Sequence, residues 1–349
     1  MPVRRSAPLL LLALALAPSL ACDEGATRGE VASPPSPGAE APPADEAPEL
    51  AAAAALPEAS PAAPAADASP AADRDAATPP DPALLAGYPW LAQDEAALAG
   101  VADTLDRRFA APPGFTRVDV DDGSFGAFLR TLPLRPAGTP VQSYAGATIL
   151  PPKHPNLAAV AAIDVGERDL QQCADSIIRL HAEWKFARGE RDHSYRSASG
   201  VALPFARYLK GERIVLVDKA LEWRAKGAPR AASHAALRSY LNGVFAWANT
   251  GSVAQQAAKV KRDALRPGDF FVVPGGPGHA VLILDVAAAE DGRVALLIGQ
   301  GFMPAQSFHV VRPSGAATPW FVVAPDDAGG VTTPFWATFP WSSLRRLDR

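Results

Sequence analysis

Residues 265–285, LRPGDFFVVPGGPGHAVLILD, carry the pattern that decides the fold of this chain. Residues 270–273 are β-forming, and they lie between the turn dipeptide Pro267-Gly268 and a Pro/Gly run at residues 274–278. Residues 280–286 are apolar at nearly every position, as expected of a strand buried on both faces. The stretch therefore predicts two neighbouring strands joined by a glycine-rich loop.

His279 is the ionisable residue at the start of the second strand. The glycines that precede it allow other groups to approach its ring closely. A histidine at the start of a core strand is placed for proton transfer or for metal binding. The alternative is a structural histidine that is hydrogen-bonded at a strand end, and this stretch alone leaves both interpretations open.

The N-terminus resembles a bacterial lipoprotein signal. Arg4 and Arg5 precede an apolar run at residues 9–16, too short to span a bilayer durably, and small residues lead to Cys22. The resemblance implies that residues 1–22 form a lipoprotein signal peptide and that Cys22 is lipidated. The protein would then be anchored to a membrane of the bacterial cell envelope, facing the periplasm or the outside. Ser19 replaces the usual leucine of this motif, and an ordinary cleaved secretory signal is the alternative.

Residues 23–86 are dominated by Ala, Pro, Glu, Asp and Ser. Such a segment buries too little apolar surface to offset the entropy lost on ordering its backbone, so we expect a disordered tether. Residues 87–349 are long enough to form a single globular domain. The formal net charge of −4 and the lack of a Lys/Arg block argue against nucleic acid as a partner.

Cys173 lies near the start of a predicted helix that runs to about residue 187. Asp169 and Gln172 form a plausible N-terminal cap, and Cys173 begins an apolar stripe that ends at Trp184. A thiol near a helix N-terminus has a lowered pKa, which favours the nucleophilic thiolate. Cysteine is also among the most buried residue types, so Cys173 could instead be an ordinary core residue.

The strand that follows His279 offers a polar partner for its ring. If residues 287–292 form the loop between the two strands, Gln300 lies directly across from His279, about 5 Å away on the same face. A tighter turn at residues 291–292 would place Pro304 there instead. The assignment of Gln300 therefore depends on the length of this loop.

A helix bearing cysteine, then a strand opening with histidine, then a polar residue on the next strand resembles the order of parts in papain-like and NlpC-like cysteine hydrolases. In that chemistry Cys173 is the nucleophile, His279 forms an ion pair with it and protonates the leaving group, and Gln300 orients the imidazole. The resemblance implies an α+β fold with a papain-like (NlpC-like) core, in which one helix packs on an antiparallel sheet.

Several motifs, in the same order, resemble the family named domain of unknown function 4846. They are DLQQCAD at 169–175, RLHAEW at 179–184, GDFFVVPGGPGHAV at 268–281 and QGFMPAQ at 300–306. The resemblance covers roughly residues 114–347. It implies a bacterial envelope lipoprotein, and it assigns no activity.

Together these features predict an envelope lipoprotein with a thiol hydrolase site, peptidase- or amidase-like, that acts on cell-wall peptides such as those of peptidoglycan. The alternative is a non-catalytic lipoprotein that binds a peptide or a glycan. The sequence suggests no cofactor, and the six histidines show no close-spaced pair typical of a metal site.

Overall fold

The computed structural model of the chain describes residues 80–93 and 95–347. The expected signal peptide at residues 1–22, its residue Cys22 and most of the expected tether at residues 23–86 lie outside these residues. The first described helix, α1 (Pro82–Leu85), falls within the last part of that expected tether. Within the described chain, we find no helix with the length and apolar character needed to cross a membrane.

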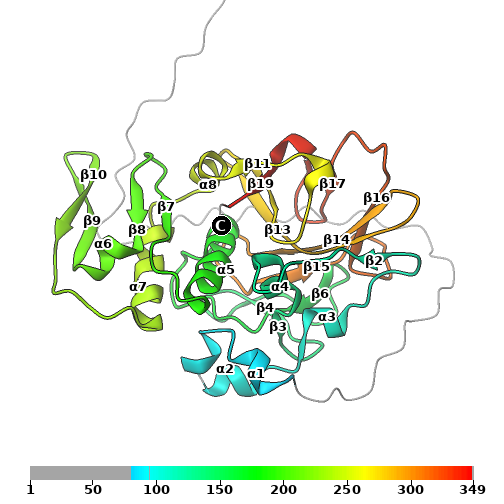
Figure 1. The fold of residues 1–349 in the computed structure, drawn as a ribbon, viewed down its shortest axis with the longest axis horizontal. Coiled ribbons are helices and arrows are strands. Elements are labelled where there is room, and N and C mark those ends of the chain that lie inside the picture. The colour runs from blue at the N-terminus through cyan, green and yellow to red at the C-terminus, as the bar shows by residue number, and fades with distance from the viewer. Residues whose placement is uncertain (1–79, 94, 348–349) are drawn as a thin grey trace, which may run out of the picture. The chain divides into compact units, whose positions relative to one another are not determined.

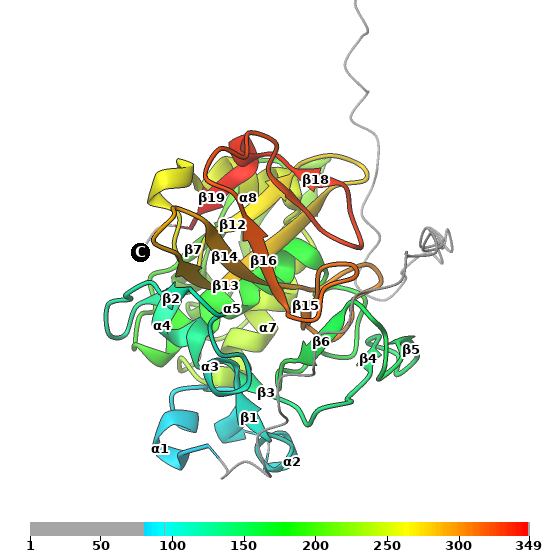
Figure 2. The same cartoon turned by 90° about the vertical axis from the view of Figure 1, so that its right-hand side faces the viewer.

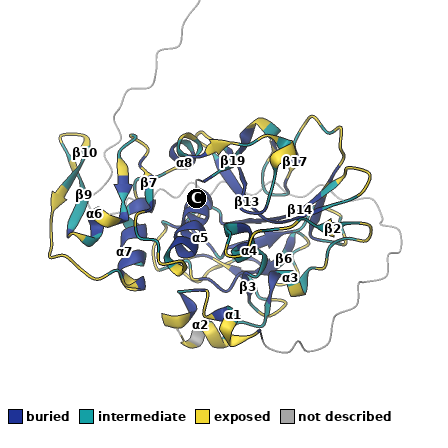
Figure 3. Ribbon diagram, in the orientation of Figure 1, coloured by how far each residue is buried: buried dark blue, intermediate teal, exposed yellow. Residues whose placement is uncertain are grey.

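Two long strands, β13 (His279–Ala288) and β14 (Val294–Gln300), form the centre of the structure. They belong to a sheet of nine strands among the described residues, and all of its pairings are antiparallel. Every residue of β13 except the last is buried. Figure 3 shows both strands as part of the buried interior.

Each central strand has different neighbours at its two ends (Figures 1 and 2). β12 (Phe270–Val273) pairs with the start of β13, and β2 (Thr116–Arg117) pairs with its end. β15 (His309–Val311) pairs with the end of β14, and β16 (Trp320–Val323) pairs with its start. The outer strands are β6 (Leu157–Val160) beyond β15, and β19 (Leu344–Arg346) and β11 (Ala258–Lys259) beyond β12.

Alternate side chains of β13 enter two separate apolar layers. Leu282 and Leu284 pack in the larger layer, which contains most of the apolar residues of α5 (Cys173–Ala187). Val281 and Ile283 pack in a smaller layer, together with Phe339 from the C-terminal segment. The sheet is therefore covered on both faces, which explains the continuous apolar run of residues 280–286.

The other helices are short, apart from α7. They are α2 (Glu95–Ala99), α3 (Leu105–Arg108), α4 (Phe125–Arg130), α6 (Phe205–Leu209), α7 (His234–Phe245) and α8 (Thr250–Gln256), with 3-10 turns at Leu91–Gln93, Arg262–Ala264 and Trp341–Ser343. Ser124 and Ser233 are the N-caps of α4 and α7, and each accepts a hydrogen bond from a backbone N–H through its hydroxyl, as is typical of serine at this position.

Five two-stranded sheets surround the central sheet in the described chain. Their pairs are β1–β3 (Asp103–Thr104 with Pro133–Leu134), β4–β5 (Val141–Gln142 with Thr148–Leu150), β7–β8 (Ser194–Arg196 with Ala202–Pro204), β9–β10 (Glu212–Val217 with Ala220–Ala225) and β17–β18 (Val331–Thr332 with Thr338–Phe339). Four of these ten strands, β7, β8, β9 and β10, lie in residues 190–232, where the sequence has one clearly β-forming run, at residues 213–217.

The expected α+β fold with a papain-like (NlpC-like) core is wrong. The described chain is organised by a large antiparallel sheet with several small sheets around it, and its helices are few and mostly short. The expectation rested on the order of three residues, which carries no information about how many strands surround them. β2 joins the sheet from a position far earlier in the chain, and β16 pairs with β14 past the intervening strand β15. Local sequence patterns do not reveal such pairings.

The carboxylate of Asp285 ties the end of β13 to two segments that precede it by more than 150 residues. Asp285 is fully buried, and its oxygens accept from Arg117 Nε at 2.6 Å and from Arg130 Nη2 at 2.7 Å. Removing one member of a buried ion pair leaves the other charges without compensation.

We expect Asp285→Ala to lower the free energy of unfolding by about 3 kcal/mol, because it leaves two partly buried arginines without their carboxylate partner. Urea denaturation of the full chain measures this change. Asp291→Ala is the matched control, because Asp291 pairs with Arg293 on the same hairpin but is exposed, and it should change stability far less. Equal effects of the two substitutions would contradict a structural role for the buried pair.

Candidate functional site

Cys173 is the first residue of α5, the longest helix of the described chain. Gln172 is its N-cap, and the Gln172 backbone N–H donates to Asp175 Oδ2 at 3.2 Å. The expected cap at Asp169 is wrong by three residues. The Asp169 carboxylate instead accepts from the Gln172 side chain at 3.0 Å and from the backbone N–H of Ala305 at 2.7 Å, so it holds the 304–306 loop against the start of α5.

Gly301 brings the chain that leaves β14 into close contact with α5. A Cβ at Gly301 would lie 2.3 Å from Ser176 Oγ and 3.0 Å from the carbonyl oxygen of Gln172. Both atoms belong to the first turn of the helix or to its cap. A glycine is therefore required here, because any larger residue would push the cysteine-bearing end of α5 away from the sheet.

The Cys173 sulfur lies among backbone N–H groups but away from solvent. Burial, together with the nearby Asp175 carboxyl, raises the pKa of the thiol to about 11, although the backbone N–H groups of Ala280, Ala174 and Cys173 act in the opposite direction. The side chain is 7 % exposed. At neutral pH the residue is therefore a thiol and not a thiolate.

His279 and Gln300 lie together at the sheet end that faces the start of α5. His279 Nε2 is 2.8 Å from Gln300 Oε1. The expected loop at residues 287–292 is wrong, because Ala288 pairs with Val294 and a bulge between Ile283 and Asp285 then shifts the register. Leu282 pairs with Gly299, so the ladder places Gln300 opposite Val281, diagonal to His279 on the same face.

A second histidine extends this contact into a chain of hydrogen bonds. His309 pairs with Gln300 across β14 and β15, and Gln300 Nε2 is 3.3 Å from His309 Nε2. His309 Nδ1 lies 3.1 Å from the carbonyl oxygen of Ser307, which can only accept, so Nδ1 carries the proton. His309 Nε2 then accepts from the Gln300 amide, Gln300 Oε1 accepts from His279 Nε2–H, and His279 Nδ1 is left with a free lone pair.

His279 and His309 are both neutral at physiological pH. Burial lowers the pKa of His279 to about 4, and the hydrogen bond to Gln300 opposes this shift only partly. Burial likewise lowers the pKa of His309 to about 4. The thiolate–imidazolium ion pair expected between Cys173 and His279 is therefore absent in this state, and the structure holds a neutral thiol and a neutral imidazole.

Aromatic side chains cover the His279 ring, which is 2 % exposed. The ring centroids of Phe302 and Trp336 lie 4.6 and 5.2 Å from that of His279. The ring centroid of Phe335 lies 6.0 Å from that of His309. Trp336 and Phe335 lie in the loop of the β17–β18 hairpin, so this hairpin covers the histidine pair.

The structure thus brings His279 and Gln300 into contact but leaves Cys173 apart from them. The Cys173 sulfur faces the backbone of Ala280, the residue next to His279, and no hydrogen bond joins the thiol to the His279 ring among the described residues. Residues 80–93 and 95–347 contain no group of three His, Cys, Asp or Glu side chains that could hold a metal ion.

The comparison with known proteins agrees with the motifs at this site. The family of domain of unknown function 4846 matches residues 105–346, which include α5, β13 and β14. The chain belongs to this family. No curated protein and no solved structure matches the chain. The comparisons therefore assign no activity to this domain of unknown function 4846, and the geometry of the site is the basis for its chemistry.

Sequence reasoning missed three residues of this site in the 4846 domain. Asp175 could have been found from its position as the third residue of the helix, where an acidic side chain accepts from the backbone N–H of the N-cap residue. His309 could have been found from the β-forming run at residues 307–312, because pairing of that run with the preceding strand places one of its side chains beside Gln300. Trp336 had no local signal, since only the folded chain brings the C-terminal aromatic segment over His279.

We expect the low pKa of His279 to make the stability of the domain pH-dependent. Its folded pKa of about 4 lies below the ordinary value of 6.5, so between these values the unfolded chain binds a proton that the folded chain does not. This contribution to stability is complete above pH 6.5 and is lost as the pH falls towards 4. A His279→Gln variant lacks it, so its stability relative to the wild type should rise by about 1.4 kcal/mol for each pH unit of acidification.

Urea denaturation of both proteins at several pH values between 4 and 7 measures this difference. His154→Gln is a matched control, because His154 is less buried and burial lowers its pKa less strongly than that of His279. Parallel stability curves for the wild type and His279→Gln would show that the imidazole has the same pKa in the folded and unfolded states.

Proposed function

We propose that this domain is a thiol-dependent hydrolase that cleaves an amide bond, with Cys173 as nucleophile, His279 as general base and Gln300 as the residue that positions the imidazole. The observation that supports it best is the hydrogen-bond chain from Ser307 to His279, which leaves Nδ1 of His279 as a proton acceptor. A neutral imidazole with one ring nitrogen fixed and the other free is the form that general base catalysis requires.

In the proposed reaction, His279 Nδ1 takes the proton of the Cys173 thiol as the sulfur attacks the amide carbonyl carbon. The C–N bond then breaks, and the imidazolium gives its proton to the leaving amine. Water, activated by the same imidazole, hydrolyses the thioester and restores the thiol. Backbone N–H groups at the start of α5 favour negative charge on the sulfur, and catalytic hydrogen bonds often tighten only when substrate binds.

The proposed substrate follows from the proposed location. The Cys22 signal would hold the domain in the bacterial cell envelope, where the peptides of peptidoglycan supply accessible amides. We therefore propose cell-wall peptides as the substrate class. These peptides would reach His279 only when the β17–β18 hairpin moves, because Trp336 covers its ring.

A second candidate function is that of a non-catalytic module that binds a peptide or a glycan. The raised pKa of the buried Cys173 thiol favours it, since an inert core cysteine would show the same property. The two functions differ in one outcome, because only a hydrolase changes its ligand.

We expect the purified protein to release products from peptidoglycan stem peptides, measured by mass spectrometry. Cys173→Ala should abolish release, and His279→Ala should lower the rate by about 10²–10⁴-fold because it removes the base. Gln300→Ala should have a smaller effect, since it only orients the ring. Gln256→Ala is a matched control on α8, where Gln256 binds the backbone of Ser194. Saturable binding of the same peptides without any product would favour the binding module.

We also propose that the chain is anchored to a membrane through lipidated Cys22. Wild-type protein should then partition into the detergent phase of a Triton X-114 extraction of the producing cells. Cys22→Ser should either release the protein into the aqueous phase or block removal of the signal, because the thiol is the site of the lipid. Cys173→Ser tests the other cysteine and should leave partitioning unchanged. A wild-type protein that stays in the aqueous phase would exclude the anchor.

A further inference from the structure

The hairpin of β9 and β10, together with the chain on either side of it, concentrates positive charge. Residues 207–230 contain seven Lys and Arg but only three Asp and Glu, whereas the whole chain has a formal net charge of −4. Figure 1 shows the hairpin at one edge of the domain, next to α6. None of the residues in its two strands is buried, as Figure 3 shows. A basic segment of an otherwise acidic chain is thus presented to the surroundings of the protein.

Most of this charge has no carboxylate beside it. Glu212 binds Arg207 and is also close enough to Lys210 to feel its charge, and Glu222 accepts from Arg224 at 2.5 Å. Within the described chain, the other cations of the segment form no ion pair: Lys210, Arg213, Lys219, Lys226 and Arg230.

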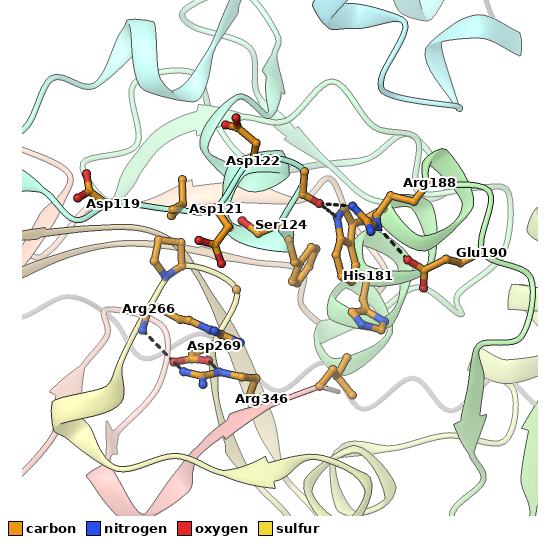
Figure 4. A pocket seen from close by; sticks show the side chains of 18 residues that line it. Asp119, Asp121, Asp122, Ser124, His181, Arg188, Glu190, Arg266, Asp269 and Arg346 are labelled. Atoms are coloured by element: carbon orange, nitrogen blue, oxygen red, sulfur yellow. Dashed lines mark hydrogen bonds and ion pairs between the residues drawn. The ribbon is translucent and has the colours of Figure 1, made fainter. Parts of the chain in front are cut away.

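Positive charge at a cavity elsewhere in the domain is compensated by contrast. Figure 4 shows this cavity, of about 310 Å³, with two ion pairs in its wall. Arg346 binds the buried Asp269 at 2.5 Å, and Arg188 binds Glu190 at 2.8 Å. The excess of cations in residues 207–230 is therefore a local property of the hairpin and its flanks.

Two of the unpaired cations are held in place by neutral groups. The guanidinium carbons of Arg213 and Arg230 lie 3.8 and 5.1 Å from the ring centroid of the buried Tyr208. Arg213 Nη1 donates to the Tyr208 carbonyl oxygen at 3.1 Å, and Arg230 Nη1 lies 3.2 Å from the Tyr208 hydroxyl oxygen. These contacts fix two guanidinium groups near the base of the hairpin without neutralising them.

The hairpin itself distributes the other cations along its length. Val217 pairs with Ala220, and the two residues between them, Asp218 and Lys219, have φ angles of 46° and 69°. This is the tight two-residue turn that matches the twist of the strands. Lys219 therefore lies at the tip, whereas the backbone of Lys226 is bonded to Gly211 at the base, roughly 20 Å away for strands of this length.

An uncovered apolar pair lies between the tip and the base. Leu216 pairs with Leu221 across the two strands. The next pair on the same face, Ile214 and Trp223, packs against the larger apolar layer. Leu216 and Leu221 belong to none of the apolar clusters of the described chain, and Leu216 is 38 % exposed. The outer half of the hairpin therefore offers two leucines to something outside the domain.

We propose that this hairpin is a docking surface for an anionic lipid bilayer, with its unpaired cations at the lipid phosphates and Leu216 in the headgroup layer. A cluster of about four to eight Lys and Arg attracts anionic membranes, and binding grows with the apolar area buried at the interface. A soluble polyanion would satisfy the cations but would leave the leucines in water. This contact needs only residues 207–230, so it is separate from the proposed lipid at Cys22.

Vesicle co-sedimentation of the full chain carrying Cys22→Ser tests the docking surface without the proposed anchor. The protein should bind vesicles of phosphatidylcholine with about 30 % phosphatidylglycerol at least tenfold more tightly than vesicles of phosphatidylcholine alone. Adding about 0.5 M salt should release it, because salt screens the attraction. Equal binding to the two kinds of vesicle, or no binding to the anionic vesicles, would overturn the proposal.

Charge reversal in the same background tests whether the hairpin is the surface that binds. Lys219→Glu with Lys226→Glu should weaken binding to the anionic vesicles about tenfold or more. Lys153→Glu with Lys261→Glu changes the net charge equally at exposed lysines outside the segment, and this matched control should bind nearly as the parent does. Equal losses in the two double variants would exclude the hairpin as the docking surface.

The exposed leucine distinguishes a bilayer from a soluble polyanion. Leu216→Ser should weaken binding to the anionic vesicles about fivefold and leave retention on a heparin column unchanged, because only a bilayer buries the side chain. Vesicle binding equal to that of the parent would overturn the bilayer as the partner and favour a soluble polyanion. All of these proteins carry Cys22→Ser, so the result is independent of lipidation and of hydrolysis by Cys173.

Discussion

The structure depends on one constraint, which is that β13 is buried along nearly its whole length and must find partners for its backbone inside the protein. Its two edges are paired with β12 and β2 on one side and with β14 on the other. These partners come from residues 116–300, so the strand cannot be completed locally. The burial of β13 therefore forces distant segments together, and the candidate site lies at the end where β12, β13 and β14 meet the start of α5.

The interior handles its polar groups in two different ways. Beside β13, His279, Gln300 and His309 form a neutral chain in which each hydrogen-bond donor has an acceptor. On α5, the fully buried Arg179 instead pairs with Glu183 at 2.7 Å. Burial alone would raise the pKa of Glu183, but the charge of Arg179 and the hydrogen bond from His234 hold it below its ordinary value. The neutral chain leaves both imidazoles uncharged, whereas the ionic network fixes the helix that carries the thiol.

Much of the local structure could be predicted from sequence. The strand at residues 270–273 and the caps at Ser124 and Ser233 follow from residue types and spacing, which act over a few residues. The predicted contact between His279 and Gln300 forms, although the register from which it was predicted is incorrect. It forms because a long amide side chain reaches the diagonal neighbour as well as the residue directly across, so the pairing tolerates a shift that a shorter side chain would not.

The sequence by itself determined where the central strands lie and where α5 runs, because periodicity, turn residues and caps are properties of neighbouring positions. Only the tertiary structure decided the composition of the sheet, the addition of His309 and Trp336 to the site, and the neutral state of Cys173 and His279. Each of these depends on contacts between residues far apart in the chain. Ionisation in particular follows from burial, and burial is a property of the completed fold rather than of any local stretch.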